Sequence, residues 1–207
     1  MNITLYHYWR SSSSWRVRWA LDYKKIKYKA VPVDLLNGES ESAAHLLRNP
    51  MGYVPALEVD GKFIIESLPI IEWLEETHQS PPLLPKNTLD RAHVRALAEL
   101  INAGIQPVQN LTVLDKYSDD PEKRSEWGQY FIRRGFVAYE KLVEKSAGLY
   151  SFGDEISLAD ICLVPQVYNA HRLNMALHEF PLIQKINTNA LKSPSGQASA
   201  PDSFKPN

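Results

Sequence analysis

The stretch 54-VPALEVDGKFIIES-67 contains the clearest fold signal in the chain. Two short apolar runs flank the pair Asp60-Gly61, which is typical of a two-residue hairpin turn. Glu66-Ser67 ends the second run, and apolar residues with helical spacing continue to about residue 78. Ser67 can open that helix, whose first turn tolerates Pro69. The stretch therefore predicts a β-hairpin that leads directly into a helix.

The segments before the hairpin alternate between strand and helix patterns. Residues 2–9 and 28–35 have the composition of strands, and Pro32 places the second of these at a sheet edge or a bulge. Residues 12–24 and 40–48 have apolar spacing typical of helices. The first 78 residues therefore predict the element order βαβαββα.

The rest of the chain has helical patterns after a proline-rich connector at 79–87. Thr88 is a candidate cap for a helix to about 117, and Asp120 with Pro121 predicts the start of another, to about 145. Ser157-x-x-Asp160 is a capping-box pattern. The tail from about 193 has little apolar content, and we expect it to be irregular. We therefore predict two domains, an α/β unit over 1–80 and an all-helical unit over 88–207.

Composition restricts the function. The net charge of −1 argues against nucleic acid or an acidic membrane as the main partner. No apolar run is long enough for a transmembrane helix, and the first ten residues do not resemble a signal peptide, so we expect a cytoplasmic protein. A single cysteine, Cys162, excludes a disulfide framework, and its apolar surroundings predict an inert buried thiol. No metal-ligand spacing such as H-E-x-x-H is present, so we expect no metal.

Several motifs together resemble one family. The stretch 8-YWRSSSSWRVRWAL-21 is similar to the SSC-x-WRVR-x-AL signature of zeta-class glutathione transferases, the maleylacetoacetate isomerases. The stretches 49-NPMGYVPALEVDG-61 and 153-GDEISLADICLVPQVYNAHR-172 also resemble that class, and the likeness covers about residues 1–190. It implies a thioredoxin-like N-terminal domain, an all-α helical-bundle C-terminal domain, a homodimer and glutathione as cofactor.

The serines at the start of the helix over 12–24 are the candidate catalytic residues. The resemblance implies that Ser11 stabilises the glutathione thiolate and that Ser12 assists. Ser13 occupies the position where the family usually has cysteine. A hydroxyl donor and the N-terminus of a helix both favour a thiolate, so the residue types suit the task. The alternative is that these serines only cap the helix.

Other positions match the family's ligand-binding residues. The resemblance implies that Val54, Pro55, Glu66, Ser67 and Gln106 bind glutathione, and that Arg10 and Arg172 bind substrate. Pro55 would be cis, with the Val54 backbone pairing with the cysteinyl part of the ligand. A guanidinium fork suits a substrate carboxylate. Plain caps at residues 66–67 and a solvated Arg172 are the alternatives. Tyr6 and Tyr8 occur where other classes have a catalytic tyrosine, a role that the serine motif disfavours.

The implied activity is glutathione-dependent cis–trans isomerisation of maleylacetoacetate to fumarylacetoacetate, a step of aromatic amino-acid catabolism. The partner is then a small cis-unsaturated diacid. Two related enzymes remain open, a maleylpyruvate isomerase and a general transferase acting on α-halo acids. A non-enzymatic module with the same fold is the hypothesis from a different class.

Overall fold

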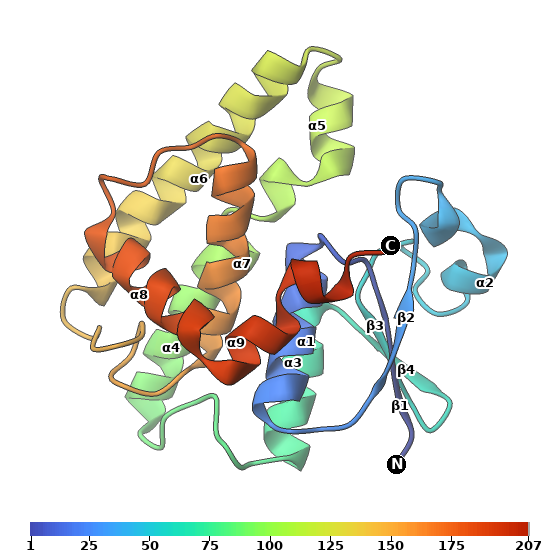
Figure 1. Cartoon of the computed structure of the whole chain (residues 1–207), viewed down its shortest axis with the longest axis horizontal. Coiled ribbons are helices and arrows are strands. Elements are labelled where there is room, and N and C mark those ends of the chain that lie inside the picture. The colour runs from blue at the N-terminus through green and yellow to red at the C-terminus, as the bar shows by residue number, and fades with distance from the viewer. Residues whose placement is uncertain (207) are drawn as a thin grey trace. The chain divides into compact units, whose positions relative to one another are not determined.

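The computed structural model describes residues 1–206, and Figure 1 shows its helices and strands. The chain forms two compact units, Met1–Pro82 together with the chain from Pro194 onward, and Leu83–Ser193. The element order confirms the predicted fold class, because a βαβαββα unit precedes a helical one. The tail, which we assigned to the helical domain, groups with the first unit instead.

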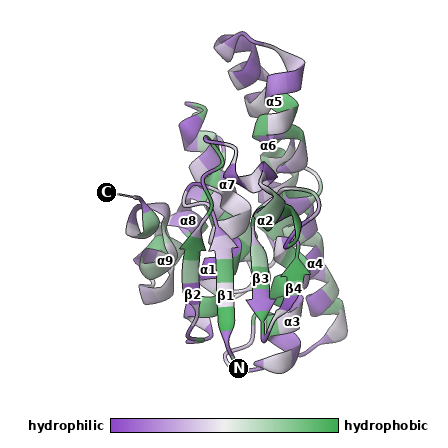
Figure 2. Cartoon of the chain, turned by 90° about the vertical axis from the view of Figure 1, so that its right-hand side faces the viewer, coloured by the Kyte–Doolittle hydropathy of each residue, from purple (hydrophilic) through white to green (hydrophobic). Residues whose placement is uncertain are grey.

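A four-stranded mixed sheet forms the first unit, in the order β2-β1-β3-β4 (Figure 2). The strands are β1 (Ile3–His7), β2 (Lys29–Pro32), β3 (Ala56–Val59) and β4 (Lys62–Ile65). β2 is parallel to β1, whereas β3 is antiparallel to β1 and β4. In the predicted hairpin turn, φ is +47° at Asp60 and +82° at Gly61, the left-handed backbone that this turn requires. Pro32 lies on an edge strand, as expected.

Two long helices, α1 (Ser12–Tyr23) and α3 (Ser67–Thr77), pack together and bury apolar side chains. The fully buried ones include Val17, Leu21, Ile70 and Leu74. The shorter η1 (Glu39–Glu41) and α2 (Ala43–Leu46) precede β3. The buried Lys24 ammonium bonds to Glu75 Oε2 at 2.7 Å. It also donates to the carbonyls of His78, at the end of α3, and of Pro81 in the connector. These bonds hold the end of α1 to α3.

The C-terminal tail is ordered into α9 (Pro194–Ser199) and η3 (Pro201–Phe204), so the prediction of an irregular tail was wrong. α9 packs against α1 (Figure 1). Trp15 Nε1 donates to Ser199 Oγ at 3.0 Å, and Trp19 Nε1 donates to Ser195 Oγ at 3.1 Å. Low apolar content did not indicate whether the tail is ordered, because its polar serine residues bind buried indole groups of α1.

The second unit is built from helices, with one isolated β-bridge between Ala147 and Gly153. The helices are α4 (Thr88–Asn102), η2 (Pro107–Gln109), α5 (Leu111–Tyr117), α6 (Pro121–Val143), α7 (Leu158–Arg172) and α8 (Pro181–Lys192). The single helix that we predicted from Thr88 to residue 117 is therefore interrupted. A Cβ at Gly104 would lie 2.5 Å from the Leu100 carbonyl oxygen, and Pro107 lacks the N–H that a continuing helix needs. Asn87, rather than Thr88, caps α4 with its side chain.

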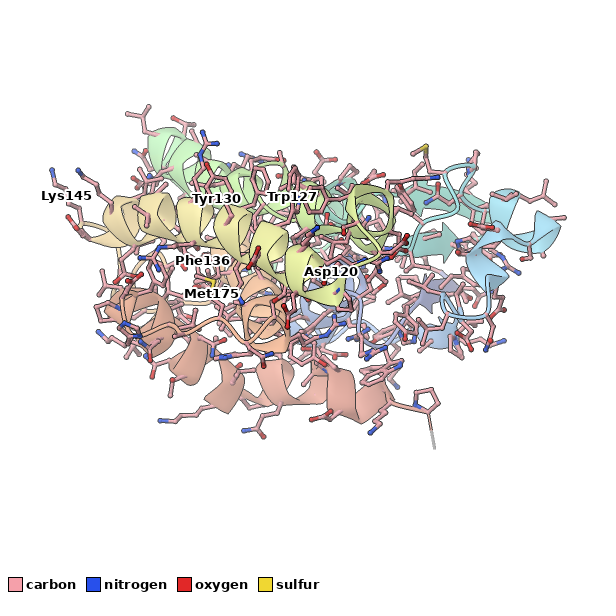
Figure 3. The ribbon with its side chains drawn as sticks, turned by 90° about the horizontal axis from the view of Figure 1, so that it is seen from above. Asp120, Trp127, Tyr130, Phe136, Lys145 and Met175 are labelled. Carbon is pink, nitrogen blue, oxygen red and sulfur yellow. The ribbon has the colours of Figure 1, made fainter. Side chains whose placement is uncertain are left out.

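Helices α6 and α7 show how this unit is built. Asp120 caps α6 as predicted, and the helix is two-faced, since Phe136 is fully buried while Tyr130 is 62% exposed (Figure 3). α7 is buried along most of its length, and the Cys162 thiol is fully buried, as expected. Across residues 1–206, no helix is long and apolar enough to cross a membrane.

Candidate active site

The start of α1 presents a row of hydroxyl and N–H groups. Ser11 is the N-cap, and its Oγ accepts a hydrogen bond from the Ser14 N–H at 3.2 Å. Ser11 is half-buried, whereas Ser12 is buried. Because a hydroxyl oxygen can accept while its own proton is donated elsewhere, the capping bond leaves the Ser11 proton available for a ligand. Capping and ligand binding are therefore compatible at Ser11.

The electrostatics at this helix start favour an anion. Helix geometry leaves the N–H groups of Ser12 and Ser13 without intrahelical acceptors. The first turn of α1 contains no acidic residue, so the helix itself supplies no carboxylate to neutralise the positive end of its dipole. Ser13 is half-buried at the second helical position. Ser11–Ser13 can together stabilise a thiolate.

The loop before β3 contains backbone groups that do not pair within the sheet, and it belongs to the same unit as the start of α1. The Val54–Pro55 bond is cis, and both side chains are buried. β3 pairs with β1 and β4 only from Ala56 onward, so the Val54 backbone lies outside the ladder. The carbonyl of the preceding residue, Tyr53, accepts hydrogen bonds from His45 Nε2 at 2.9 Å and from Asn49 Nδ2 at 3.0 Å.

Glu66 and Ser67 lie at the start of α3. Glu66, not Ser67, is the N-cap, and its side chain makes no capping bond. Its backbone has φ +68° and ψ 128°, a conformation that is rare for a residue with a side chain and is characteristic of ligand-binding positions. The Glu66 carboxylate is exposed, whereas Ser67 is buried and its Oγ accepts from Arg16 Nη1 at 3.2 Å. Arg16 therefore connects α1 to this second helix start.

Arg10 precedes the serines directly. Its guanidinium carbon lies 5.0 Å from the centre of the Trp9 ring, and its Nη2 donates to Tyr8 Oη at 3.3 Å. Within residues 1–206, the buried Arg10 Nε has no hydrogen-bond partner. A buried cationic donor without an acceptor is costly, and a carboxylate ligand would satisfy it.

The remaining predicted residues, Gln106 and Arg172, belong to the second unit. Gln106 is half-buried at the N-cap of η2 and makes no side-chain capping bond. Arg172 is the exposed last residue of α7, with its guanidinium 6.0 Å from the Tyr168 ring centre. The structure thus brings Arg10, the serines, Val54, Glu66 and Ser67 into one unit. The association of Gln106 and Arg172 with them stays a prediction.

Tyr6, one of the two tyrosines that precede the serine motif, bonds to a carboxylate. Tyr6 Oη donates to Glu58 Oε2 at 2.9 Å, and burial, followed by that carboxylate, raises the Tyr6 pKa. A raised pKa disfavours the tyrosinate. Among residues 1–206, no group of three or more His, Cys, Asp or Glu side chains is arranged to hold a metal ion.

Three supporting residues were not assigned to the site from the sequence. Arg16 is fully buried and bonds to Ser67. His45 and Asn49 grip the Tyr53 carbonyl. The sequence signal for these two residues was their spacing, four positions apart just before Pro50. Only their burial in the structure shows that they face inward.

Comparisons with known proteins agree with this geometry. Residues 5–82 match the glutathione S-transferase N-terminal domain family. The probable maleylacetoacetate isomerase 2 of Drosophila melanogaster is 48% identical over 95% of this chain and 87% of its own. A solved maleyl pyruvate isomerase, a bacterial zeta-class glutathione-S-transferase, is 37% identical with a TM-score of 0.95 and covers 99% of both chains.

A third relative was solved with ligands. The maleylacetoacetate isomerase of Anaeromyxobacter dehalogenans 2CP-1 is 45% identical, with a TM-score of 0.89 and coverage of 97% of this chain and 95% of its own. That structure has glutathione in the active site, and another of the same enzyme has dicarboxyethyl glutathione and citrate there. These likenesses cover almost the whole chain and confirm the resemblance in the sequence motifs. This chain belongs to the glutathione S-transferase family, in the zeta-class branch that contains the maleylacetoacetate isomerases.

Proposed function

We propose that this protein is a glutathione-dependent cis–trans isomerase that converts maleylacetoacetate to fumarylacetoacetate. One observation carries the proposal: Ser11 caps α1 through its oxygen while its proton stays free, at a helix start without an acidic residue. That arrangement stabilises a thiolate. The isomerase names of the relatives, at nearly full coverage, supply the reaction class.

The first unit fits glutathione at three points. The Ser11–Ser13 helix start suits the sulfur, and the Val54 backbone, which lies outside the ladder, suits the cysteinyl amide. Ser67 and the N–H groups at the start of α3 suit the γ-glutamyl carboxylate, while the exposed Glu66 carboxylate suits its ammonium. Gln106 of the second unit is a further proposed contact.

When bound, glutathione supplies the thiolate that adds to the cis double bond, permits rotation and leaves as the trans alkene forms. Ser11 donates a hydrogen bond to the sulfur and so keeps it ionised, with Ser12 assisting and Ser13 in the same helix turn. The Arg10 guanidinium, with its unsatisfied Nε, orients a substrate carboxylate. Arg172 is the second proposed carboxylate anchor. Orientation and thiolate stabilisation are thus the protein's contribution to the rate.

Maleylpyruvate is the second candidate substrate, because a maleyl pyruvate isomerase has a TM-score of 0.95 to this structure. The test is to assay the purified protein with maleylacetoacetate and with maleylpyruvate, each with and without glutathione. We expect turnover of maleylacetoacetate with the higher kcat/KM and an absolute requirement for glutathione. A higher kcat/KM for maleylpyruvate would reassign the substrate, and glutathione-independent turnover would refute the mechanism.

The same assays separate the remaining alternatives. Turnover of an α-halo acid in the absence of any isomerase activity would favour a general transferase. A non-enzymatic module would show no heat on titration with glutathione and no turnover. Arg172→Ala should raise KM for dicarboxylates and leave glutathione affinity unchanged; an unaltered KM would return Arg172 to a surface role.

The cellular setting is part of the proposal. The reaction places the enzyme in aromatic amino-acid catabolism in the cytoplasm, and a chain whose single cysteine, Cys162, is buried fits a reducing compartment. Family membership supports a homodimer. Light scattering of the purified chain would test this, and a monomeric mass at working concentration would contradict it.

A further inference from the structure

Arg18 is fully buried on α1, and its guanidinium bonds to groups from two distant parts of the chain. Its Nη1 donates to the Tyr8 carbonyl at 3.4 Å and lies 3.2 Å from His7 Nδ1, and its Nη2 donates to the Trp9 carbonyl at 3.0 Å. Its Nε donates to the Ser199 carbonyl in the C-terminal tail at 3.1 Å. Arg18 therefore joins the tail to the segment that leads into the serine row.

His7 takes part as a neutral acceptor. Burial, followed by the positive charge of Arg18, lowers the pKa of His7 to about 3, so its ring is uncharged at neutral pH. Nδ1 can then accept a hydrogen bond from Arg18 Nη1. This bond fixes one more donor of the guanidinium fork in place.

The tail covers Arg18 with an aromatic ring. The Phe204 ring centre lies 4.6 Å from the Arg18 guanidinium carbon, and the same ring meets His7 edge-on at 5.3 Å. Ser199 is held in turn by the Trp15 indole, which donates to its Oγ. The tail thus supplies Arg18 with a carbonyl acceptor and a cation–π contact.

The Arg18 guanidinium and the proposed catalytic serine donate hydrogen bonds to the same carbonyl. The Tyr8 carbonyl accepts from both Arg18 Nη1 and the Ser11 N–H, the latter at 3.1 Å. The Tyr8 N–H donates to Ser14 Oγ at 3.4 Å, and the Ser14 N–H bonds back to Ser11 Oγ. A continuous set of hydrogen bonds therefore runs from the tail to the Ser11 hydroxyl.

We propose that the C-terminal segment Pro194–Phe204 is a positioning element for the Ser11 hydroxyl, acting through Arg18 on the carbonyls of Tyr8 and Trp9. The proposal rests on the proposed function, because it concerns the group that stabilises the thiolate. A buried guanidinium keeps its orientation only while its donors are satisfied. Without the tail, Arg18 would turn towards other acceptors and the Tyr8–Ser11 segment would shift.

The test compares three variants of the full chain with wild type. Phe204→Ala removes the ring over Arg18 from a half-buried tail position, so folding should survive. Arg18→Lys keeps the charge but replaces the fork with a single ammonium. Ser203→Ala is the matched control, because among residues 1–206 the Ser203 hydroxyl bonds within the tail, to the Gln197 carbonyl at 3.2 Å.

Three quantities are measured: kcat and KM, the thiolate absorbance of the glutathione complex against pH, and hydrogen exchange of the Ser11 amide. For Phe204→Ala we expect kcat to fall about three- to tenfold. The thiolate should appear at higher pH, Ser11 should exchange faster, and KM for glutathione should stay unchanged. Arg18→Lys should show the same pattern more strongly, and Ser203→Ala should match wild type.

Two outcomes overturn the proposal. One is a Phe204→Ala protein with wild-type thiolate titration and wild-type Ser11 exchange, whatever Arg18→Lys does. The other is a Ser203→Ala protein with defects equal to those of Phe204→Ala, which would mean that general loosening of the tail is responsible. Failure of the proposed function is distinguishable, because wild type itself would then show no thiolate signal, whereas Ser11 exchange would still report on the tail.

Discussion

The helices α1 and α7 both begin with a serine cap, yet their first turns differ in chemistry. At the start of α7, Ser157 and Asp160 form a capping box, and the Asp160 carboxylate is fully buried. It accepts from the Ser151 N–H at 2.7 Å, and from the Ser157 N–H and Oγ at 2.8 and 2.7 Å. At the start of α1, Ser11 is half-buried, and the first turn has no acid.

The comparison shows what turns a helix start into a candidate ligand site. Asp160 supplies negative charge to the N-terminus of α7 and accepts from three nearby donors, and the Leu158 N–H donates to the Leu83 carbonyl at 2.9 Å. In α1 the third helical position is Ser14, whose side chain instead accepts from the Tyr8 N–H. The positive dipole end and the donors of Ser12 and Ser13 remain available. The residue at the third helical position is thus one difference between the structural cap of α7 and the proposed catalytic cap of α1.

The largest effect is expected from breaking the structural cap. Asp160→Ala would leave three donors buried without an acceptor, and we expect it to lower the free energy of unfolding by about 3–5 kcal/mol. Urea denaturation measures this loss. Turnover per folded molecule should stay near wild type, since Asp160 has no proposed role in the reaction. A stability within 1 kcal/mol of wild type would contradict the structural assignment.

Removing the Ser11 cap of α1 should have the opposite effect, a large loss of activity and a small loss of stability. Ser11→Ala should lower kcat/KM by roughly 10²–10³, because the donor to the sulfur is lost. The free energy of unfolding should fall by only about 1 kcal/mol, the usual value of a serine cap. Steady-state kinetics and denaturation are measured on the same preparation, with Ser13→Ala as the control. Equal, small activity losses in both variants would show that Ser11 is not the thiolate partner.

Making α1 resemble α7 sharpens the comparison further. Ser13→Asp places a carboxylate in the first turn of α1, where it favours the helix but repels a thiolate. We expect the thiol of bound glutathione to ionise at higher pH and kcat/KM at neutral pH to fall about tenfold. Ser13→Asn is the matched control of similar size without the charge. If both variants lose activity equally, bulk rather than charge is responsible.

The smallest effect is expected from restoring the family's usual residue. Ser13→Cys should change kcat within about threefold, since glutathione brings the only thiolate that the reaction needs. Wild-type activity should also survive alkylation of the protein before glutathione is added, because Cys162 is fully buried. Turnover that appears only in Ser13→Cys would mean that the wild-type chain is not an isomerase.

Local sequence signals predicted the parts of this fold that depend on short-range chemistry. The Asp60-Gly61 turn, the Asp120 cap and the Ser157-x-x-Asp160 box each need only residues within a few positions of one another. The prediction failed where local patterns were ambiguous, as between Asn102 and Leu111, where the helix breaks. Apolar residues with helical spacing continue through that region, so periodicity alone could not locate the break.

The motifs of the chain, by themselves, determined the family, the thioredoxin-like and helical elements and the candidate site residues, because these depend on residue types at fixed spacing. Only the tertiary structure decided which polar residues are buried together. Arg16 bonds to Ser67, His45 and Asn49 hold the Tyr53 carbonyl, and Arg18 joins the tail to the serine loop. These partners are up to 181 positions apart. No local pattern encodes such a contact, since the packing of the whole unit selects which acceptor satisfies each buried donor.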